Sequence, residues 1–205
     1  MSMTLNPVNE AAFQKAVQSL ETLNRAAVFH PTGTGKSCIA WKVVEAHPQT
    51  TFFWLVAGAQ RLALRQAELA RYNGGTLPGN VRFCDCEKLA AATPEQWVRL
   101  GEQKPGCIVL DCYHELSAVC WAQSVQKLLR MCPQAKVLGL GVPNGAPVCA
   151  AAQELFADCI VSHMTVAEAM AAGTMPVPSA YAALLWPQEE ELATLRARIK
   201  NLCMP

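Results

Sequence analysis

A glycine-containing loop between an apolar segment and the start of a helix constrains this fold more than any other sequence feature. Residues 27–37 read AVFHPTGTGKS, so an apolar run leads into Gly33 and Gly35 and then into Lys36 and Ser37. Glycines let the backbone turn tightly enough for its N–H groups to converge on one point, where a helix start adds positive potential. The pattern predicts a phosphate-binding loop that joins a buried strand to a helix.

The predicted phosphate contacts come from the whole second half of this loop. They are Thr32, Gly33, Thr34, Gly35, Lys36 and Ser37. The Lys36 ammonium can reach β- and γ-phosphates, and the Ser37 hydroxyl can hold Mg²⁺. The general motif has glycine where this chain has His30. A glycine-rich turn beside an incidental lysine is the alternative interpretation, and the flanking strand and helix patterns disfavour it.

An acidic residue at the end of a neighbouring buried strand is the second part that such a loop needs. Residues 106–111 read GCIVLD, a continuous apolar run that is typical of a parallel sheet covered on both faces. Asp111 ends this run, and we expect it to hold Mg²⁺ together with Ser37. An aspartate that only caps the following turn is the alternative.

Helical and strand patterns alternate along the chain, which indicates an α/β fold. Helices are predicted over 7–23, 36–47, 60–72, 87–92, 94–102, 118–131, 166–172 and 188–202. Strands are predicted over 25–30, 50–57, 81–85, 106–111, 136–140 and 159–161. We expect three layers, with a mostly parallel sheet between helices. Residues 1–186 form the predicted nucleotide-binding domain, and residues 187–205 a C-terminal helical tail.

Composition excludes several classes of protein. Of the 205 residues, 52% are apolar and 16% are charged, which excludes a chain that is mainly disordered. The formal net charge of +1 gives no basic excess of the kind a free-standing nucleic-acid binder carries. The N-terminus lacks a signal-peptide pattern, and no apolar run approaches the roughly 18 residues that span a bilayer. We therefore expect a cytoplasmic protein without membrane contact.

The ten cysteines stand mostly inside apolar segments. Free cysteine behaves as a small buried hydrophobe, so we interpret them as reduced thiols of the core. A zinc site or a disulfide framework is the alternative, which the absence of a CxxC pair from the sequence disfavours.

Several segments together resemble the first RecA-like domain of superfamily-two DEAD/DEAH-box helicases. They are HPTGTGKS at 30–37, RFCDCEKLA at 82–90, VLDCYHELSAVCWAQSVQKLL at 109–129, KVLGLG at 136–141 and MTVAEAMAAG at 164–173, after a leader helix that contains Asn9. The resemblance runs from about residue 9 to residue 181. It implies a RecA-like P-loop NTPase domain that binds ATP with Mg²⁺. It also implies contact with nucleic acid, DNA being favoured over RNA, and with a second RecA-like domain or partner protein.

The resemblance also suggests roles for two further residues. Gln14 matches a leader-helix glutamine that contacts adenine, although a plain solvent-facing glutamine is an equal alternative. His114, in the sequence DCYH, would act with Lys36 and Asp111 by coupling nucleotide to the neighbouring domain, or it would simply satisfy its loop. The arginines at 61, 65 and 71 could touch a phosphate backbone, but a solvated helix face is the more common reading of such a set.

Departures from the family pattern bear on the reaction. Cys112 stands where the family has the glutamate that polarises the attacking water, and a thiol is a poor replacement for that carboxylate. Gly141, Val142 and Pro143 replace a hydroxyl-bearing motif that couples hydrolysis to strand movement. The second domain would supply an arginine finger, and only about two dozen residues follow Tyr181. We therefore expect weak or absent ATP hydrolysis.

Two alternatives stay open at this point. One is the active ATPase half of a helicase or translocase that a second RecA-like domain completes. The other is a non-catalytic nucleotide-sensing partner protein. Cys112 and Pro143 favour the second alternative over the first.

Overall fold

A computed structural model describes residues 3–111, 119–143, 155–156, 158–177, 193–194 and 196. The strands are β1 (Arg25–Phe29), β2 (Phe52–Val56), β3 (Val81–Asp85), β4 (Cys107–Leu110), β5 (Lys136–Gly141) and β6 (Ile160–His163). The helices are α1 (Pro7–Thr22), α2 (Lys36–Ala46), α3 (Ala59–Tyr72), α4 (Cys86–Ala90), α5 (Pro94–Glu102), α7 (Val119–Met131) and α9 (Val166–Ala171). The elements predicted between residues 7 and 172 occur at these places, with ends that differ by a few residues.

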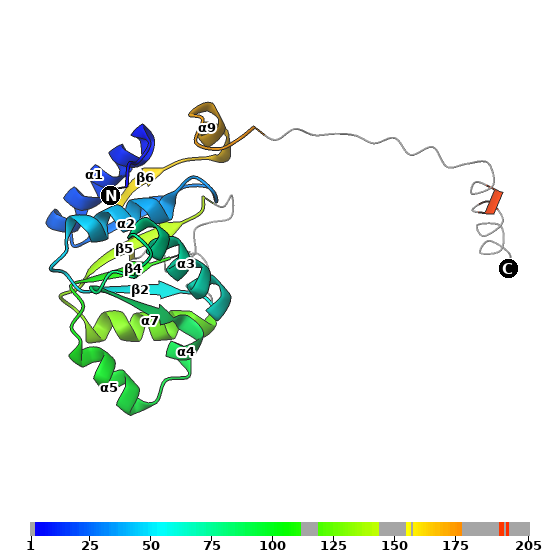
Figure 1. The fold of residues 1–205 in the computed structure, drawn as a ribbon. Helices are drawn as coiled ribbons and strands as arrows, with labels where there is room; N and C mark the ends of the chain where they lie inside the picture. The colour runs from blue at the N-terminus through cyan, green and yellow to red at the C-terminus, as the bar shows by residue number, and fades with distance from the viewer. Residues whose placement is uncertain are drawn as a thin grey trace.

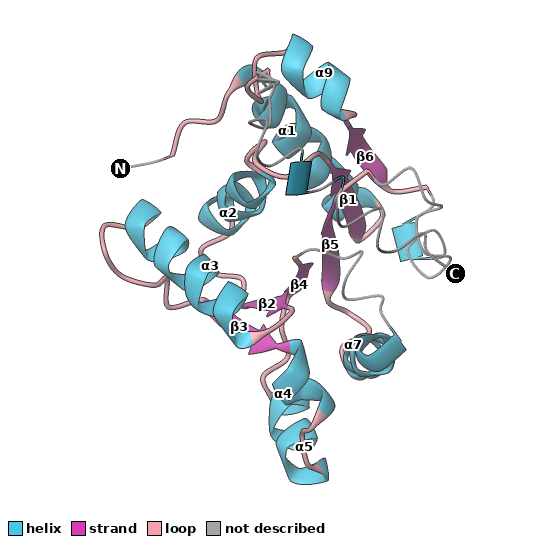
Figure 2. Cartoon of the chain, turned by 90° about the vertical axis from the view of Figure 1, so that its right-hand side faces the viewer, coloured by secondary structure: helices cyan, strands magenta, loops and turns pink. Residues whose placement is uncertain are grey.

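The six strands form one sheet in the order β3-β2-β4-β5-β1-β6, and every neighbouring pair is parallel. Figures 1 and 2 show α1, α2 and α3 on one face of the sheet and α4, α5 and α7 on the other. The predicted three-layer α/β architecture is therefore confirmed. The predicted mostly parallel sheet is confirmed, and all pairings of the described strands are parallel.

Both faces of the sheet are buried, which explains the continuous apolar runs. In β2, Phe52, Trp54 and Val56 pack into the core on the side of α1 and α2. Phe53 and Leu55 point the other way, into the core under α4, α5 and α7. Successive side chains of a strand alternate between faces, so a strand covered on both sides reads as apolar at every position.

Helix starts follow capping signals in the sequence. Thr165 and Glu168 form a capping box at the start of α9, and Thr93 and Gln96 form a second one before α5. In such a box the side chains satisfy backbone N–H groups that the first turn leaves unpaired. Of the predicted tail, residues 193, 194 and 196 are helical, and the remainder lies outside the described residues.

The parallel topology brings three chain segments to the same edge of the sheet, where the strands end. The loop after β1 leads to Lys36, the turn after β2 contains Gly58, and Asp111 follows β4 directly. In open α/β sheets, ligands bind outside this carboxyl edge. Among the helices of the described ranges, none is long and apolar enough to cross a membrane.

Candidate nucleotide-binding site

The loop between β1 and α2 has the backbone that its two glycines predict. Gly33 and Gly35 have φ angles of +88° and +87°, in the region that side chains disfavour. Gly35 precedes α2 as its N-terminal cap residue, in the left-handed conformation. The Thr34 hydroxyl donates to the Pro31 carbonyl oxygen at 2.8 Å, which closes the turn on itself. The N–H groups at the start of α2 therefore open onto this loop.

Lys36 bends back over the same loop. Its Nζ donates to the carbonyl oxygens of His30 at 2.7 Å and Pro31 at 2.8 Å. These two bonds hold the ammonium at the loop rather than in bulk solvent. A phosphate on the backbone N–H groups would thus meet a positive charge at short range, and the donor set fits a nucleotide phosphate.

Asn9 of α1 forms a hydrogen bond with the backbone of the loop. Its Nδ2 donates to the Thr34 carbonyl oxygen at 2.8 Å, and the side chain is buried. The Oδ1 atom of Asn9 is buried without a hydrogen-bond partner. We did not predict this contact from the sequence. A signal existed, because Asn9 lies on the buried face of α1 together with Ala12, Phe13 and Ala16.

His30, which stands where the general motif has glycine, is buried beside the loop. The residue is 0% exposed, and its Nε2 lies 2.7 Å from the Ser162 hydroxyl on β6. Its Nδ1 is buried without a partner. Burial, and after it the charges of Lys36 and His163, lower the pKa of His30 from 6.5 to about 4. The imidazole is therefore neutral near pH 7.

Asp111 is buried at the end of β4 and is held by two donors on one oxygen. Arg65 Nε donates to Asp111 Oδ2 at 2.6 Å, and Trp54 Nε1 donates to the same atom at 3.1 Å. Arg65 also pairs with Glu68 one turn further along α3. The interpretation as a solvated face does not describe Arg65, since this residue is the counterion of the buried Asp111.

A small pocket of about 80 Å³ lies beside this ion pair at the start of α3. Its walls are Val56, Arg61, Leu64, Arg65, Glu68 and Asp111. At the other end of α3, the Arg71 guanidinium lies 5.3 Å from the centre of the Tyr72 ring. The three arginines of this helix therefore have different surroundings.

The oxygen atoms available for Mg²⁺ are those that this ion prefers. Ser37 offers a hydroxyl and Asp111 a carboxylate, and Mg²⁺ at nucleotide sites is usually held by one or two such groups with phosphates and water. Arg65 already places a cation on Asp111, so this carboxylate accommodates positive charge. Among the described residues, no group of three or more His, Cys, Asp or Glu could hold a metal.

One of the residues predicted by resemblance stands apart from this geometry. Gln14 is exposed on α1, where its Nε2 donates to Glu10 Oε1 at 2.9 Å. His114 lies outside the described residues, as does Cys112. The structure thus brings together the loop, Asn9 and His30, and it places Asp111 at the same sheet edge.

Cysteines of the described part are free thiols. Cys86 and Cys107 are buried, and burial raises the pKa of each thiol to about 12. Cys38 and Cys159 are partly exposed. Cys86 and Cys107, like the buried Cys132, fit the predicted role as small apolar core residues.

Comparison with known proteins supports the fold. No protein-family model matches this chain, and no curated protein matches its sequence. It is similar to the structure of the ATP-dependent Type ISP restriction-modification enzyme LlaBIII bound to DNA, with a TM-score of 0.60 and 14% identity over 84% of this chain. It is also similar to a hypothetical ATP-dependent RNA helicase from Sulfolobus tokodaii, with a TM-score of 0.58 and 11% identity over 80% of this chain.

These likenesses extend over a part of each larger protein. The chain spans 16% of the restriction-modification enzyme and 53% of the RNA helicase. At such low sequence identity they show the fold, which is the RecA-like α/β fold of helicase domains. The expected RecA-like architecture is confirmed.

Proposed function

We propose that this chain is an ATP- and Mg²⁺-binding helicase-like domain of the superfamily-two DEAD/DEAH type, with ATP hydrolysis weak or lost. The observation that carries the proposal is the loop between β1 and α2. Its two glycines have positive φ, and the Lys36 ammonium is bound to the loop's own carbonyl groups. A strand, such a loop and a helix in this order form the phosphate site of P-loop proteins.

Each residue of the proposed site has one task. Residues 32–37 bind phosphate through backbone N–H groups, and Lys36 neutralises its charge. Ser37 and Asp111 hold Mg²⁺, which when bound offsets the charge of the phosphate oxygens. Gln14 as an adenine contact and His114 as a coupling residue complete the proposal by resemblance.

The proposed loss of hydrolysis rests on Cys112. A general base must hold and deprotonate the attacking water, and glutamate does so with a carboxylate. The residue after Asp111 here is a thiol. The active ATPase half of a helicase or translocase is the second candidate function, and the helicase-like fold favours it. This candidate requires a group other than Cys112 to deprotonate the attacking water.

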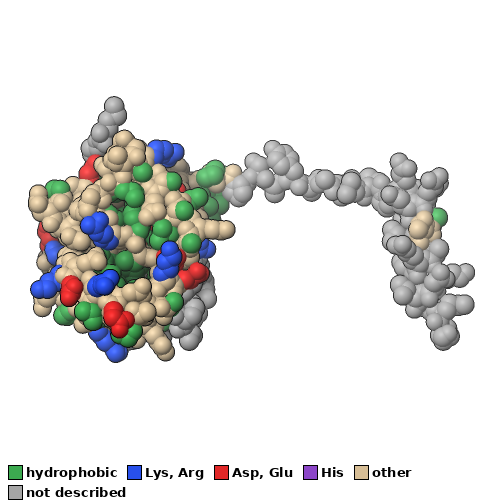
Figure 3. Space-filling view, turned by 60° about the horizontal axis from the view of Figure 1, so that its bottom comes forward, with side chains coloured by type: hydrophobic (Ala, Val, Ile, Leu, Met, Phe, Trp, Pro, Cys, Tyr) green, Lys and Arg blue, Asp and Glu red, His purple; other side chains and the backbone are tan. Residues whose placement is uncertain are grey.

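The proposed partners follow from the same resemblance. They are nucleotide, nucleic acid with DNA favoured over RNA, and a second RecA-like domain or partner protein, in the cytoplasm. Figure 3 shows Lys and Arg side chains mixed with Asp and Glu on one face of the molecule, with apolar side chains between them. On that face nucleic acid would meet local basic groups, rather than a continuous positive surface.

Binding of a fluorescent ATP analogue to the purified chain tests the proposal. Lys36→Ala should abolish binding, because the phosphate charge is then left without its closest cation. Lys42→Ala is the matched control, since Lys42 lies on the same helix and pairs with Glu45. If the wild-type chain fails to bind the analogue, or if Lys36→Ala binds it as well as the wild type does, the proposal is wrong.

A second measurement addresses hydrolysis. Phosphate release by the wild type should be at background, and Cys112→Glu should raise it in a manner that depends on Lys36. Wild-type turnover that Lys36→Ala removes would instead favour the active ATPase half.

A further inference from the structure

We propose that Arg65 competes with a divalent cation for Asp111, so that metal binds only when the guanidinium leaves Oδ2. The inference rests on the proposed function, and it concerns the regulation of that same site. It starts from a plain observation: the carboxylate predicted to hold Mg²⁺ already has a cation bonded to it at 2.6 Å.

The two donors on Asp111 Oδ2 differ in how easily they can leave. Trp54 is fully buried in the middle of β2, so its indole N–H is fixed by the core. The Arg65 side chain is 20% exposed, whereas that of Asp111 is 3% exposed. Arg65 is therefore the partner that can move, and Trp54 stays to orient the carboxylate.

The surroundings of α3 offer the Arg65 guanidinium a second position, away from Asp111. Leu69 is the buried residue of this helix, and Leu64 beside Arg65 is 65% exposed. The pocket of about 80 Å³ next to Asp111 offers space, and Glu68 is already a second acidic partner of Arg65. Arg65 can thus release Asp111 while keeping an ion pair.

Electrostatics makes the two cations alternatives. A divalent ion near Oδ2 repels the guanidinium, and a guanidinium on Oδ2 occupies the lone pairs that metal-bound water would use. Hydrogen bonds to charged groups are the stronger ones in proteins. Because Mg²⁺ must first displace this one, the intact bond between Arg65 and Asp111 should raise the Mg²⁺ concentration for half-saturation about tenfold, which corresponds to about 1.4 kcal/mol.

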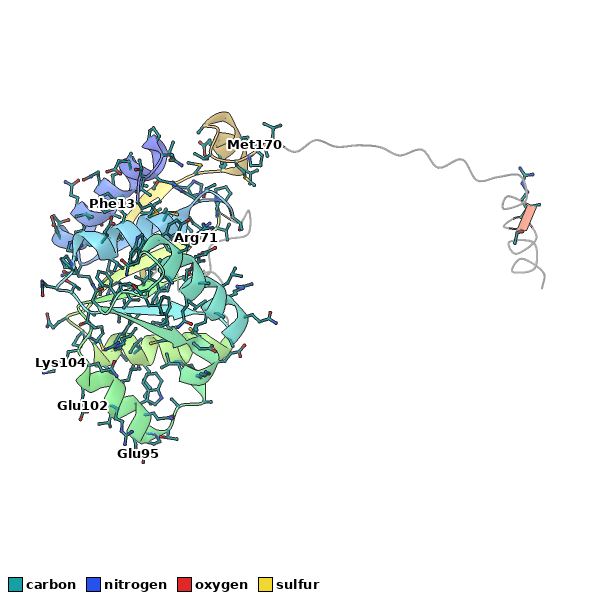
Figure 4. The ribbon with its side chains drawn as sticks, in the orientation of Figure 1. Phe13, Arg71, Glu95, Glu102, Lys104 and Met170 are labelled. Atoms are coloured by element: carbon teal, nitrogen blue, oxygen red, sulfur yellow. The ribbon has the colours of Figure 1, made fainter. Side chains whose placement is uncertain are left out.

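The test is an Mg²⁺ titration of the chain loaded with a fluorescent ATP analogue. Binding of the analogue is first measured with and without Mg²⁺. Mg²⁺ is then titrated to find the concentration that gives half of the maximal signal change. Arg65→Met keeps the aliphatic stem but removes the cation, and it should lower that concentration about tenfold. Arg71→Met is the matched control, because Arg71 lies in the last turn of the same helix, near α2 (Figure 4), and should leave the value within about twofold.

A double-mutant cycle shows whether Arg65 acts through Asp111. Asp111→Asn should raise the half-saturating Mg²⁺ concentration at least about tenfold. Adding Arg65→Met to Asp111→Asn should then change nothing. Arg65→Lys retains charge but lacks the Nε–H donor, and it should shift the value in the same direction as Arg65→Met by a smaller factor, even if the methionine variant does not fold.

The outcomes separate the two proposals. If the wild type binds no analogue with or without Mg²⁺, the proposed function fails, and this inference fails with it. If the analogue binds but Arg65→Met and Arg65→Lys need as much Mg²⁺ as the wild type, or more, the competition is refuted and the proposed function stands. The competition is also refuted if Arg65→Met keeps its full effect in the Asp111→Asn background.

Discussion

Replacing Gly35 with alanine should destabilise this protein more than replacing Gly33, although both glycines belong to one loop. Their φ angles are +87° and +88°, so an alanine pays nearly the same backbone penalty at either position, about 1–2 kcal/mol. The two sites differ in their surroundings. A Cβ on Gly33 would have no atom within 4 Å, whereas a Cβ on Gly35 would lie 2.8 Å from Asn9 Nδ2.

The additional cost at Gly35 comes from the contact that Asn9 would lose. Asn9 Nδ2 donates to the Thr34 carbonyl oxygen, and the side chain is buried, so a methyl group at 2.8 Å forces it away. Leaving a buried polar group without its partner costs about 1–3 kcal/mol. We therefore expect about 1–2 kcal/mol for Gly33→Ala and about 2–5 kcal/mol for Gly35→Ala.

Urea unfolding followed by circular dichroism measures both free-energy changes, provided that the slope with denaturant stays constant. The pair is measured again in the Asn9→Ala background, where the clash partner is absent. The difference between Gly35→Ala and Gly33→Ala should disappear there. Equal costs in the wild-type background, or a difference that persists without the Asn9 side chain, would refute the reasoning.

Three further predictions concern pH, reactivity and capping. Burial is the main cause that lowers the pKa of His30 from 6.5 to about 4, so between these pH values the unfolded chain binds a proton that the folded chain does not. The free energy of unfolding should therefore fall by about 2–3 kcal/mol from pH 6.5 to pH 4, and by less in His30→Gln. Urea unfolding at a series of pH values measures this change. Burial raises the pKa of Cys107 to about 12, so mass spectrometry after brief alkylation at pH 8 should find Cys38 modified and Cys107 protected until urea is added. Thr93→Ala removes the side-chain half of the capping box that Thr93 forms with Gln96, and it should cost about 1 kcal/mol in thermal or urea unfolding; no change would exclude a capping contribution.

Much of the fold could be predicted because its signals are local. The apolar runs of β2 and β4 identify buried strands, and Thr165 with Glu168 marks the start of α9. The strand order could not be predicted in the same way. The pairing of β1 with both β5 and β6 joins segments more than a hundred residues apart, and no short pattern in the sequence specifies it.

The predicted site follows the same division. The loop was found because its chemistry lies in consecutive residues, and Asp111 because it ends a strand. The ion pair between Arg65 and Asp111 joins residues 46 positions apart, and helical spacing on α3 indicated only a polar face. Local sequence patterns thus predict candidate ligand-binding groups, whereas the counterions of such groups come from packing between distant elements.

Buried polar atoms without hydrogen-bond partners mark positions that lower the free energy of unfolding. The described residues contain three such side-chain atoms: Asn9 Oδ1, His30 Nδ1 and Trp41 Nε1. Each unsatisfied buried group costs free energy, and native proteins keep few of them. Two of the three residues contact the loop: Asn9 donates to the Thr34 carbonyl oxygen, and the His30 carbonyl oxygen accepts from Lys36. Core packing alone would favour apolar side chains at these positions, whereas Asn9 and His30 instead hold the backbone and the lysine of the loop in place through their hydrogen bonds.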